Sequence, residues 1–191
     1  MLDQEFIRLV DRIQARKCEE QTIEVKAAAR GCPERLYDTF SSFSNQDEGG
    51  VIVFGLDEKQ GFQKVGVYDA QDLQKKLMEV GEEMTPVVRP VLSVFDEDGL
   101  VFVTAEIPPV DLTDRPCFKT ARGRLKGSFV RVGDADKPMT EYEVYSYEAY
   151  RRNYRDDIRP VEGITPASLD QTQVEQYLLK RKLDRPNFAA V

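Results

Sequence analysis

"GGVIVFGLD", residues 49–57, joins a pair of glycines to a nearly continuous apolar run that ends in an aspartate. A strand with one face in water alternates apolar and polar residues, so an unbroken run predicts a central strand covered on both faces. The stretch "EEQTIEVK", residues 19–26, does alternate, with Ile23 and Val25 on one side and Glu24 on the other. It predicts a half-buried strand in which Glu24 faces away from the apolar side.

Helices and further strands are predicted before and after these two stretches. The signals are apolar residues at helical spacing, helix caps, and turns rich in glycine, aspartate and proline. The predicted elements are a helix over 2–15, a helix from Pro33 to about Asn45, a returning hairpin strand in "FQKVGV" (62–67), a helix over 70–82 capped by Asp69, strands over 87–95 and 100–107, strands over 118–121 and 128–132 around a loop at 122–127, and helices opened by the capping boxes Thr140–Glu143 and Ser168–Gln171.

This order of elements predicts an α+β fold, with a mixed and mainly antiparallel sheet flanked by helices and a helical C-terminal extension. We expect one domain with an N-terminal helix over residues 1–158, followed by a linker and a helix over 159–191. The chain ends in "RPNFAAV", an apolar segment without a helix cap or a polar tail. We therefore expect a truncated sequence, with this segment as the start of a further C-terminal module.

Composition removes several classes of function. The 191 residues include no histidine, which excludes Ser-His-Asp catalysis, Cys-His catalysis and the usual zinc hydrolase sites. The three cysteines are widely spaced and outside any CxxC pattern, so neither a disulfide framework nor a structural zinc site is indicated. There is no apolar run of the roughly 20 residues that span a bilayer and no secretory signal, so we expect a cytoplasmic protein without a membrane partner.

The charge distribution leaves one place for contact with a polyanion. The formal net charge of -7 argues against phosphate binding by the whole surface. In contrast, "KTARGRLKGSFVR", residues 119–131, contains five basic residues and no acidic one, namely Lys119, Arg122, Arg124, Lys126 and Arg131. These side chains are candidates for nucleic-acid phosphates, beside Phe118 and Phe129. The alternative is a solvated hairpin tip whose charges balance an acidic body.

Several motifs, in this order, resemble the Schlafen AlbA_2 domain, also called the divergent AAA-4 region. They are "EEQTIEVK", "FSSFSNQDEGGVIVFGLDE", "KVGVYD", "RPCFK" and "GSFVRVGDADKPMTEYE". Their order and spacing cover most of residues 15–155, although Val25 replaces a phenylalanine of the family and the glycine turn is one residue longer. The resemblance implies a nucleic-acid-binding domain of a bacterial transcriptional regulator, with DNA favoured over RNA. No GxxxxGK[ST] sequence occurs, so the AAA label does not indicate ATP binding through a P-loop.

The resemblance also implies an alternative activity, because some Schlafen proteins use this domain as a metal-dependent endoribonuclease. Carried over by motif, the carboxylates would be Glu19, Glu24 and Asp57, which could hold Mg²⁺ or Mn²⁺. Strand geometry favours Glu20 instead of Glu19, since residues five apart on a regular strand point to opposite faces, and both stay candidates. Lys26 in the same motif is a further candidate for nucleic-acid contact, or it pairs with Glu24 on a solvated face.

A third alternative is a module for protein–protein interaction or self-association. The chain is acidic overall, and the helix predicted from about residue 141 lies in a tyrosine-rich stretch. The tyrosines are Tyr142, Tyr145, Tyr147, Tyr150 and Tyr154. We expect most of them to pack with their polar tips outward rather than to form a platform for bases.

Overall fold

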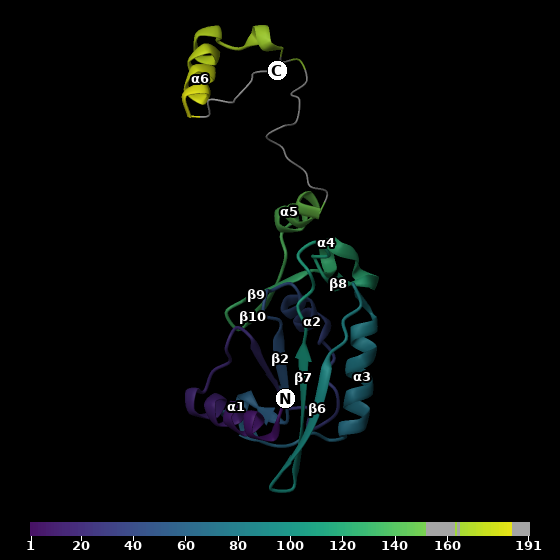
Figure 1. The fold of residues 1–191 in the computed structure, drawn as a ribbon. Coiled ribbons are helices and arrows are strands. Elements are labelled where there is room, and N and C mark those ends of the chain that lie inside the picture. Colours follow the sequence, from purple (N-terminus) through teal and green to yellow (C-terminus); the bar gives the residue numbers. More distant parts are fainter. Residues whose placement is uncertain (152–162, 164, 185–191) are drawn as a thin grey trace. The chain divides into compact units, whose positions relative to one another are not determined.

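The apolar run at the centre of the sequence forms a strand inside a four-stranded sheet. In the computed structural model, which describes residues 1–151, 163 and 165–184, Gly50–Phe54 is strand β2. The strand order is β1-β2-β7-β6, with β1 at Ile23–Lys26, β7 at Leu100–Ile107 and β6 at Val91–Glu97 (Figure 1). β1 runs parallel to β2, and the other two pairs are antiparallel. The sheet is therefore mixed and mainly antiparallel, which confirms the predicted α+β class.

Helix α1 (Asp3–Arg16) covers one face of this sheet. Its buried side chains lie on one stripe and pack with Ile23 and Val25 of β1 and with apolar residues of the other strands. The ring of Phe6 stacks on that of Phe95, with ring centroids 4.3 Å apart. The alternation read from "EEQTIEVK" is thus correct for the apolar side of β1, which faces α1.

Helices α2 (Tyr37–Ser44) and α3 (Ala70–Glu82) cover the opposite face, and Figure 1 shows α1 and α3 on opposite sides of the sheet. Ile52 of β2 packs into this second cluster, whereas Val53 packs into the cluster under α1. Both faces of β2 are therefore covered, as the unbroken apolar run predicts. The carboxylate of Asp69 accepts hydrogen bonds from two backbone N–H groups at the start of α3, which confirms the predicted cap.

The glycine pair before β2 meets a steric need. Gly49 has a φ of +68°, a conformation that favours glycine. Gly50 lies against the ring of Phe43, and a Cβ at this position would overlap that ring. The two glycines therefore allow the chain to leave α2 and enter the centre of the sheet directly beneath it.

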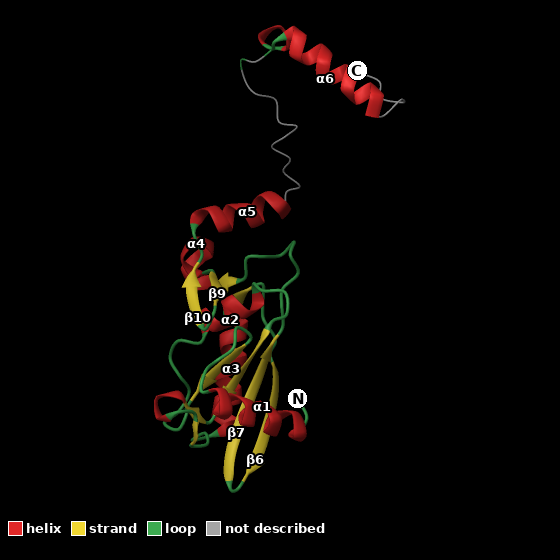
Figure 2. Cartoon of the chain, turned by 90° about the vertical axis from the view of Figure 1, so that its left-hand side faces the viewer, coloured by secondary structure: helices red, strands yellow, loops and turns green. Residues whose placement is uncertain are grey.

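Short elements complete the part of the chain that the structure describes. Three strand pairs are antiparallel: β3 with β4, β5 with β8, and β9 with β10. Their bounds and those of the remaining helices are β3 Leu56–Asp57, β4 Gln63–Lys64, β5 Met84–Thr85, β8 Phe118–Lys119, β9 Phe129–Val132, β10 Ala135–Pro138, η1 Glu58–Gln60, η2 Thr120–Arg122, α4 Gly123–Gly127, α5 Glu141–Arg151, η4 Pro166–Ser168 and α6 Gln171–Asp184. Figure 2 shows the strands and helices from a second side.

The chain divides into two units, Met1–Tyr154 and Arg155–Val191, and the sheet lies in the first. Within the second, η4 and α6 are described. The domain boundary predicted at residue 158, most of the predicted linker after it and the "RPNFAAV" ending lie outside the described residues. No helix in the described part of the chain is long and apolar enough to cross a membrane.

Several local predictions are wrong. The helix predicted from Pro33 begins only at Tyr37, and the strand predicted over 118–121 ends at Lys119. The segment at 122–127 is not a loop between strands, because α4 forms there after the 3-10 turn η2. In "FQKVGV" only Gln63 and Lys64 pair as a strand. The box at Ser168 does not open α6; the helix begins at Gln171, and Asp170 accepts the hydrogen bond from the N–H of Gln173. The Thr140–Glu143 box is confirmed by the reciprocal bonds at the start of α5.

Candidate functional site

The outer edge of β1 is closed by side chains. Along the inner edge, the carbonyls of Thr22 and Lys26 accept hydrogen bonds from β2 and from the residue that follows it. The backbone groups of Ile23 and Val25 therefore point the other way, since successive residues of a strand alternate. The N–H of Val25 donates to Glu19 Oε1 at 2.7 Å, and the carbonyl of Ile23 accepts from Arg131 at 3.1 Å.

Arg131 is the centre of a buried group of charges. It comes from β9, and its side chain is only 1% exposed. It forms ion pairs with Glu24 at 2.7 Å, with Asp136 at 3.0 Å and with Glu19 at 3.5 Å, and the Glu24 carboxylate also pairs with Lys26. We call these five residues the Arg131 cluster. Three carboxylates face two cations in it, and each charge has an opposite partner within the fold.

Neighbouring elements hold the Arg131 cluster in place. Asp136 lies opposite Arg131 in the β9–β10 hairpin and accepts hydrogen bonds from the hydroxyls of Thr39 and Ser42 on α2. The guanidinium of Arg131 lies over the ring of Phe43, 5.1 Å from its centroid. The cluster therefore joins β1, α2 and the β9–β10 hairpin, which are far apart in the sequence.

Burial changes the proton affinity of Glu19 in this cluster. Burial raises the pKa of Glu19 from 4.5 to about 7, and the neighbouring charge of Glu24 adds to the rise. The N–H of Val25 and the charges of Lys26 and Arg131 oppose it. Glu19 therefore changes its charge near neutral pH rather than near pH 4.

The structure brings some predicted carboxylates together and separates others. Glu19 and Glu24 meet at Arg131, so Glu19 rather than Glu20 lies with Glu24. Glu20 pairs instead with Arg12 and Arg16 of α1. The spacing argument that favoured Glu20 fails because β1 begins at Ile23, beyond both glutamates.

Asp57 is engaged elsewhere. Its carboxylate accepts hydrogen bonds from the N–H of Lys59 at 3.0 Å and from the side chain of Gln60 at 2.7 Å, as the cap of η1. Within the described residues, no three His, Cys, Asp or Glu side chains are placed to hold one metal ion. Glu19, Glu24 and Asp57 are therefore not assembled as a Mg²⁺ or Mn²⁺ site, and nuclease activity stays a prediction that this geometry does not favour.

The expectation that Glu24 lies on a solvated face is wrong. Its side chain is 7% exposed, because Arg131 of β9 lies against it, and Asp136 of β10 and the ring of Phe43 on α2 enclose Arg131 in turn. Lys26 does pair with Glu24, as the structural alternative predicted, but the pair is part of a buried cluster. Sequence reasoning missed Asp136, which a hairpin reading of "VRVGDADKP" would have placed opposite Arg131.

The six predicted nucleic-acid contacts separate into buried, paired and free cations. Arg131 and Lys26 belong to the Arg131 cluster, so the role of Arg131 as a phosphate contact is contradicted by its burial. Lys119 pairs with Glu83 at 3.0 Å, and Arg124 pairs with Glu148 of α5. These four cations already have carboxylate partners in the described part of the chain.

Arg122 and Lys126 are exposed and form no ion pair among the described residues. The guanidinium of Arg122 lies 4.8 Å from the centroid of the Tyr37 ring, and the amine of Lys119 lies 4.7 Å from the same centroid. The aromatic ring holds this part of the segment against α2. We call residues 119–126 the basic segment; it lies at β8 and α4, near α5 in Figure 1.

Comparison with known proteins adds a family and a fold. The family model described as Schlafen, AlbA_2 matches residues 19–140. The solution structure of the N-terminal domain of a putative ATP-dependent DNA helicase RecG-related protein from Nitrosomonas europaea matches with a TM-score of 0.53 and 25% identity, over 70% of this chain and 92% of that chain. No curated protein matches the chain.

A second structure shows the fold alone. The crystal structure of the DIP2311 protein from Corynebacterium diphtheriae matches with a TM-score of 0.50 and 17% identity. The match covers 78% of this chain and 29% of that chain. The fold described above therefore also occurs within a longer protein.

Proposed function

The chain belongs to the Schlafen AlbA_2 family, and we propose on this premise that it binds nucleic acid, with duplex DNA as the expected ligand. The solved relative with 25% identity is the N-terminal domain of a protein described as DNA helicase-related, which supports a role in nucleic-acid binding. We further propose that the domain serves a bacterial transcriptional regulator. Its part would be to attach that regulator to DNA.

The observation that carries the proposal is the basic segment. Arg122 and Lys126 are exposed and free of ion pairs in the described part of the chain, and the sequence around them contains no acidic residue from Lys119 to Arg131. Phosphate oxygens would complete the hydrogen bonding of both side chains. Lys119 and Arg124 lie beside them with partly exposed side chains and add to the local positive potential.

The size of this surface sets the expected salt dependence. Two free cations, with up to two more that exchange a carboxylate for a phosphate, give about two to four phosphate contacts. For duplex DNA the logarithm of the affinity then falls with the logarithm of salt with a slope of about -2 to -4. This is a small contact for a protein of net charge -7, so binding by the isolated chain should be weak at physiological salt.

The proposal is tested by salt-titrated binding to a duplex of about 20 base pairs and to a single-stranded RNA of equal length. The double variant Arg122→Glu with Lys126→Glu should reduce duplex affinity at least tenfold and flatten the salt slope. The matched control is Arg8→Glu with Lys75→Glu, which changes two exposed cations on α1 and α3 by the same charge. Equal duplex affinities of the two double variants would show that the basic segment does not bind the nucleic acid.

A further inference from the structure

The outer edge of β6 carries backbone groups that no strand among the described residues pairs with. β6 and β7 are joined by a two-residue turn at Asp98 and Gly99, both with positive φ, and Glu97 lies opposite Leu100. In such a hairpin the closing pair is hydrogen-bonded, and every second pair after it is too. The N–H and C=O groups of Leu92, Val94 and Asp96 therefore point away from β7. No described strand lies beyond β6 in either view (Figures 1 and 2).

Apolar side chains are exposed along this edge. Val91 is 59% exposed and Val94 is 45% exposed. Val91 faces the side of α1, as Phe95 does, whereas the side chain of Val94 takes the opposite face, across from Val103.

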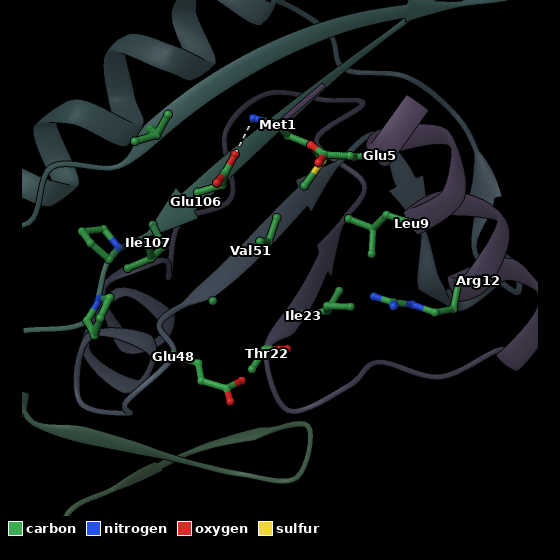
Figure 3. A pocket seen from close by; sticks show the side chains of 14 residues that line it. Met1, Glu5, Leu9, Arg12, Thr22, Ile23, Glu48, Val51, Glu106 and Ile107 are labelled. Carbon is green, nitrogen blue, oxygen red and sulfur yellow. Dashed lines mark hydrogen bonds and ion pairs between the residues drawn. The ribbon is translucent and has the colours of Figure 1, made fainter. Parts of the chain in front are cut away.

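Two hollows lie on the side of α1. The larger, about 640 Å³, lies at Val91 and extends over Leu9, Ile23 and Val51. Figure 3 shows the last three side chains around it.

The second hollow, about 460 Å³, lies farther along β6. It is lined by Val94, Phe95 and the following acidic residues, together with Phe6 and Ile7 of α1. Side chains of a further strand would alternate between the two faces of the sheet, so every second one would point toward the side on which α1 and these hollows lie. The edge thus offers both hydrogen-bonding groups and apolar space.

The charge around the edge is negative. Three glutamates and one arginine line the larger hollow: Glu5, Glu48, Glu106 and Arg12, of which the arginine already pairs with Glu20. Acidic residues also surround the smaller hollow: Asp3, Asp96 and Glu97. Two of these acids have cationic partners, since Glu106 pairs with the amino group of Met1 and Glu97 pairs with Lys64. The remaining acids favour a cationic occupant and disfavour a nucleic acid.

We propose that the β6 edge binds an extended segment of a partner protein as a fifth strand. The segment would carry apolar residues at alternate positions, which enter the two hollows, and lysine or arginine residues at its ends, which meet the acidic rim. Backbone hydrogen bonds to Leu92, Val94 and Asp96 would supply affinity, and the hollows and the rim would supply specificity. This interaction is separate from the basic segment and does not depend on nucleic-acid binding.

The chemistry of the edge disfavours a second copy of the chain as the occupant. Residues 91–98 contain three acids and no base, so a second copy of this strand brings no cation to the acidic rim. Pro90 lies at an outward position in the alternation and has no N–H to donate. A basic segment of a different protein supplies the missing cations and does not bring a second proline to the pairing.

The test uses two synthetic peptides, KKVTVTVKK and EEVTVTVEE, with the intact chain. Amide hydrogen exchange is followed by NMR, and affinity is followed by fluorescence anisotropy. The lysine peptide should slow exchange at Leu92, Val94 and Asp96 at least tenfold, and the glutamate peptide should leave it unchanged. No slowing at these amides, or equal slowing by both peptides, would overturn the proposal.

Variants and light scattering separate the remaining outcomes. Asp96→Lys should weaken binding of the lysine peptide about tenfold, whereas Asp134→Lys, an equal charge change at an exposed site on the β9–β10 turn, should not. Equal weakening by both would show that only net charge matters and would overturn the proposal. A dimer in the free protein, with the three amides already protected, would identify a second copy as the occupant and would overturn it too.

Discussion

The two edges of the sheet differ in whether their outward backbone groups are hydrogen-bonded. At β1 the outward N–H of Val25 and the outward carbonyl of Ile23 are bonded by Glu19 and Arg131, whose side chains are buried. At β6 the outward backbone N–H and C=O groups have no described strand beyond them, and exposed valines and acidic residues surround them. Proteins protect strand edges from unwanted pairing by covering or charging them. Here one edge is covered by a cluster of charges, and the other is left available.

The comparison changes how the charged residues of "EEQTIEVK" are understood. Glu19 and Glu24 satisfy Arg131 and close an edge, so their presence in this stretch has a structural explanation that needs no metal. A buried cation such as Arg131 is in turn stable only with such partners. The two edges can therefore be compared by mutation, because a change at β1 breaks buried partnerships and a change at β6 does not.

The largest effect is expected for Arg131→Met. The variant leaves Glu19, Glu24 and Asp136 buried without their shared cation, which costs about 3–5 kcal/mol of unfolding free energy at neutral pH. Urea denaturation followed by circular dichroism measures it. Lys126→Met is the control, since this exposed lysine of α4 has no carboxylate or ring partner in the described part of the chain and should change stability by less than about 0.5 kcal/mol. Equal losses in both variants would refute the structural role of the cluster.

A smaller loss is expected for Val25→Ala on the same strand. The Val25 side chain is buried under α1 with Phe6 and Val53, and its truncation should cost about 1.5–3 kcal/mol. The same denaturation measurement applies. A loss of the size expected for an exposed valine would show that α1 does not cover β1 in solution.

Much of the fold could be predicted from local patterns. The unbroken run at residues 50–54 predicted the central strand, and Asp69 predicted the start of α3, because both signals lie within the element that they define. The burial of Glu24 could not be predicted in this way. Its alternation says only which side it takes, and the cation that buries it there, Arg131, lies in a hairpin about 100 residues later in the sequence.

Local patterns also fail to predict which residues of the candidate site are buried. The basic residues of the segment at 119–131 look equivalent in the sequence, yet Arg131 is buried and Arg122 is exposed. The difference arises because Arg131 lies in a strand that packs on α2, whereas Arg122 lies in a 3-10 turn at the surface. Long-range packing, which no local periodicity encodes, separates a structural cation from a candidate phosphate contact.

The pH dependence of the β1 edge isolates Glu19. Its folded-state pKa of about 7 lies above the ordinary 4.5, so its protonated form stabilises the fold fully below about pH 4.5, and this contribution is lost as the pH rises through about 7. Glu19→Gln stays neutral throughout. The stability of the variant relative to the wild type should therefore rise between pH 5 and pH 8, by about 1–2 kcal/mol, since a full tenfold change in proton affinity is worth about 1.4 kcal/mol and partial hydration reduces the effect.

Urea denaturation of both proteins at several pH values measures this difference. Asp38 also has a raised pKa, from burial and the neighbouring Asp136, but it is present in both proteins and cancels in the comparison. Parallel curves for Glu19→Gln and the wild type would mean that Glu19 is already fully ionised in the fold at pH 5.

The smallest effect is expected for Val94→Ala, the counterpart of Val25→Ala at the open edge. Val94 is 45% exposed and its outward N–H has no partner among the described strands, so truncation should change the unfolding free energy by less than about 0.5 kcal/mol. Amide exchange sharpens the contrast between the edges. The N–H of Val25, bonded to the buried Glu19, should exchange only on larger opening, whereas that of Val94 should exchange rapidly from the native state. Slow exchange at Val94 in the free, monomeric chain would mean that this edge is already covered within the same molecule, and the difference between the two edges would disappear.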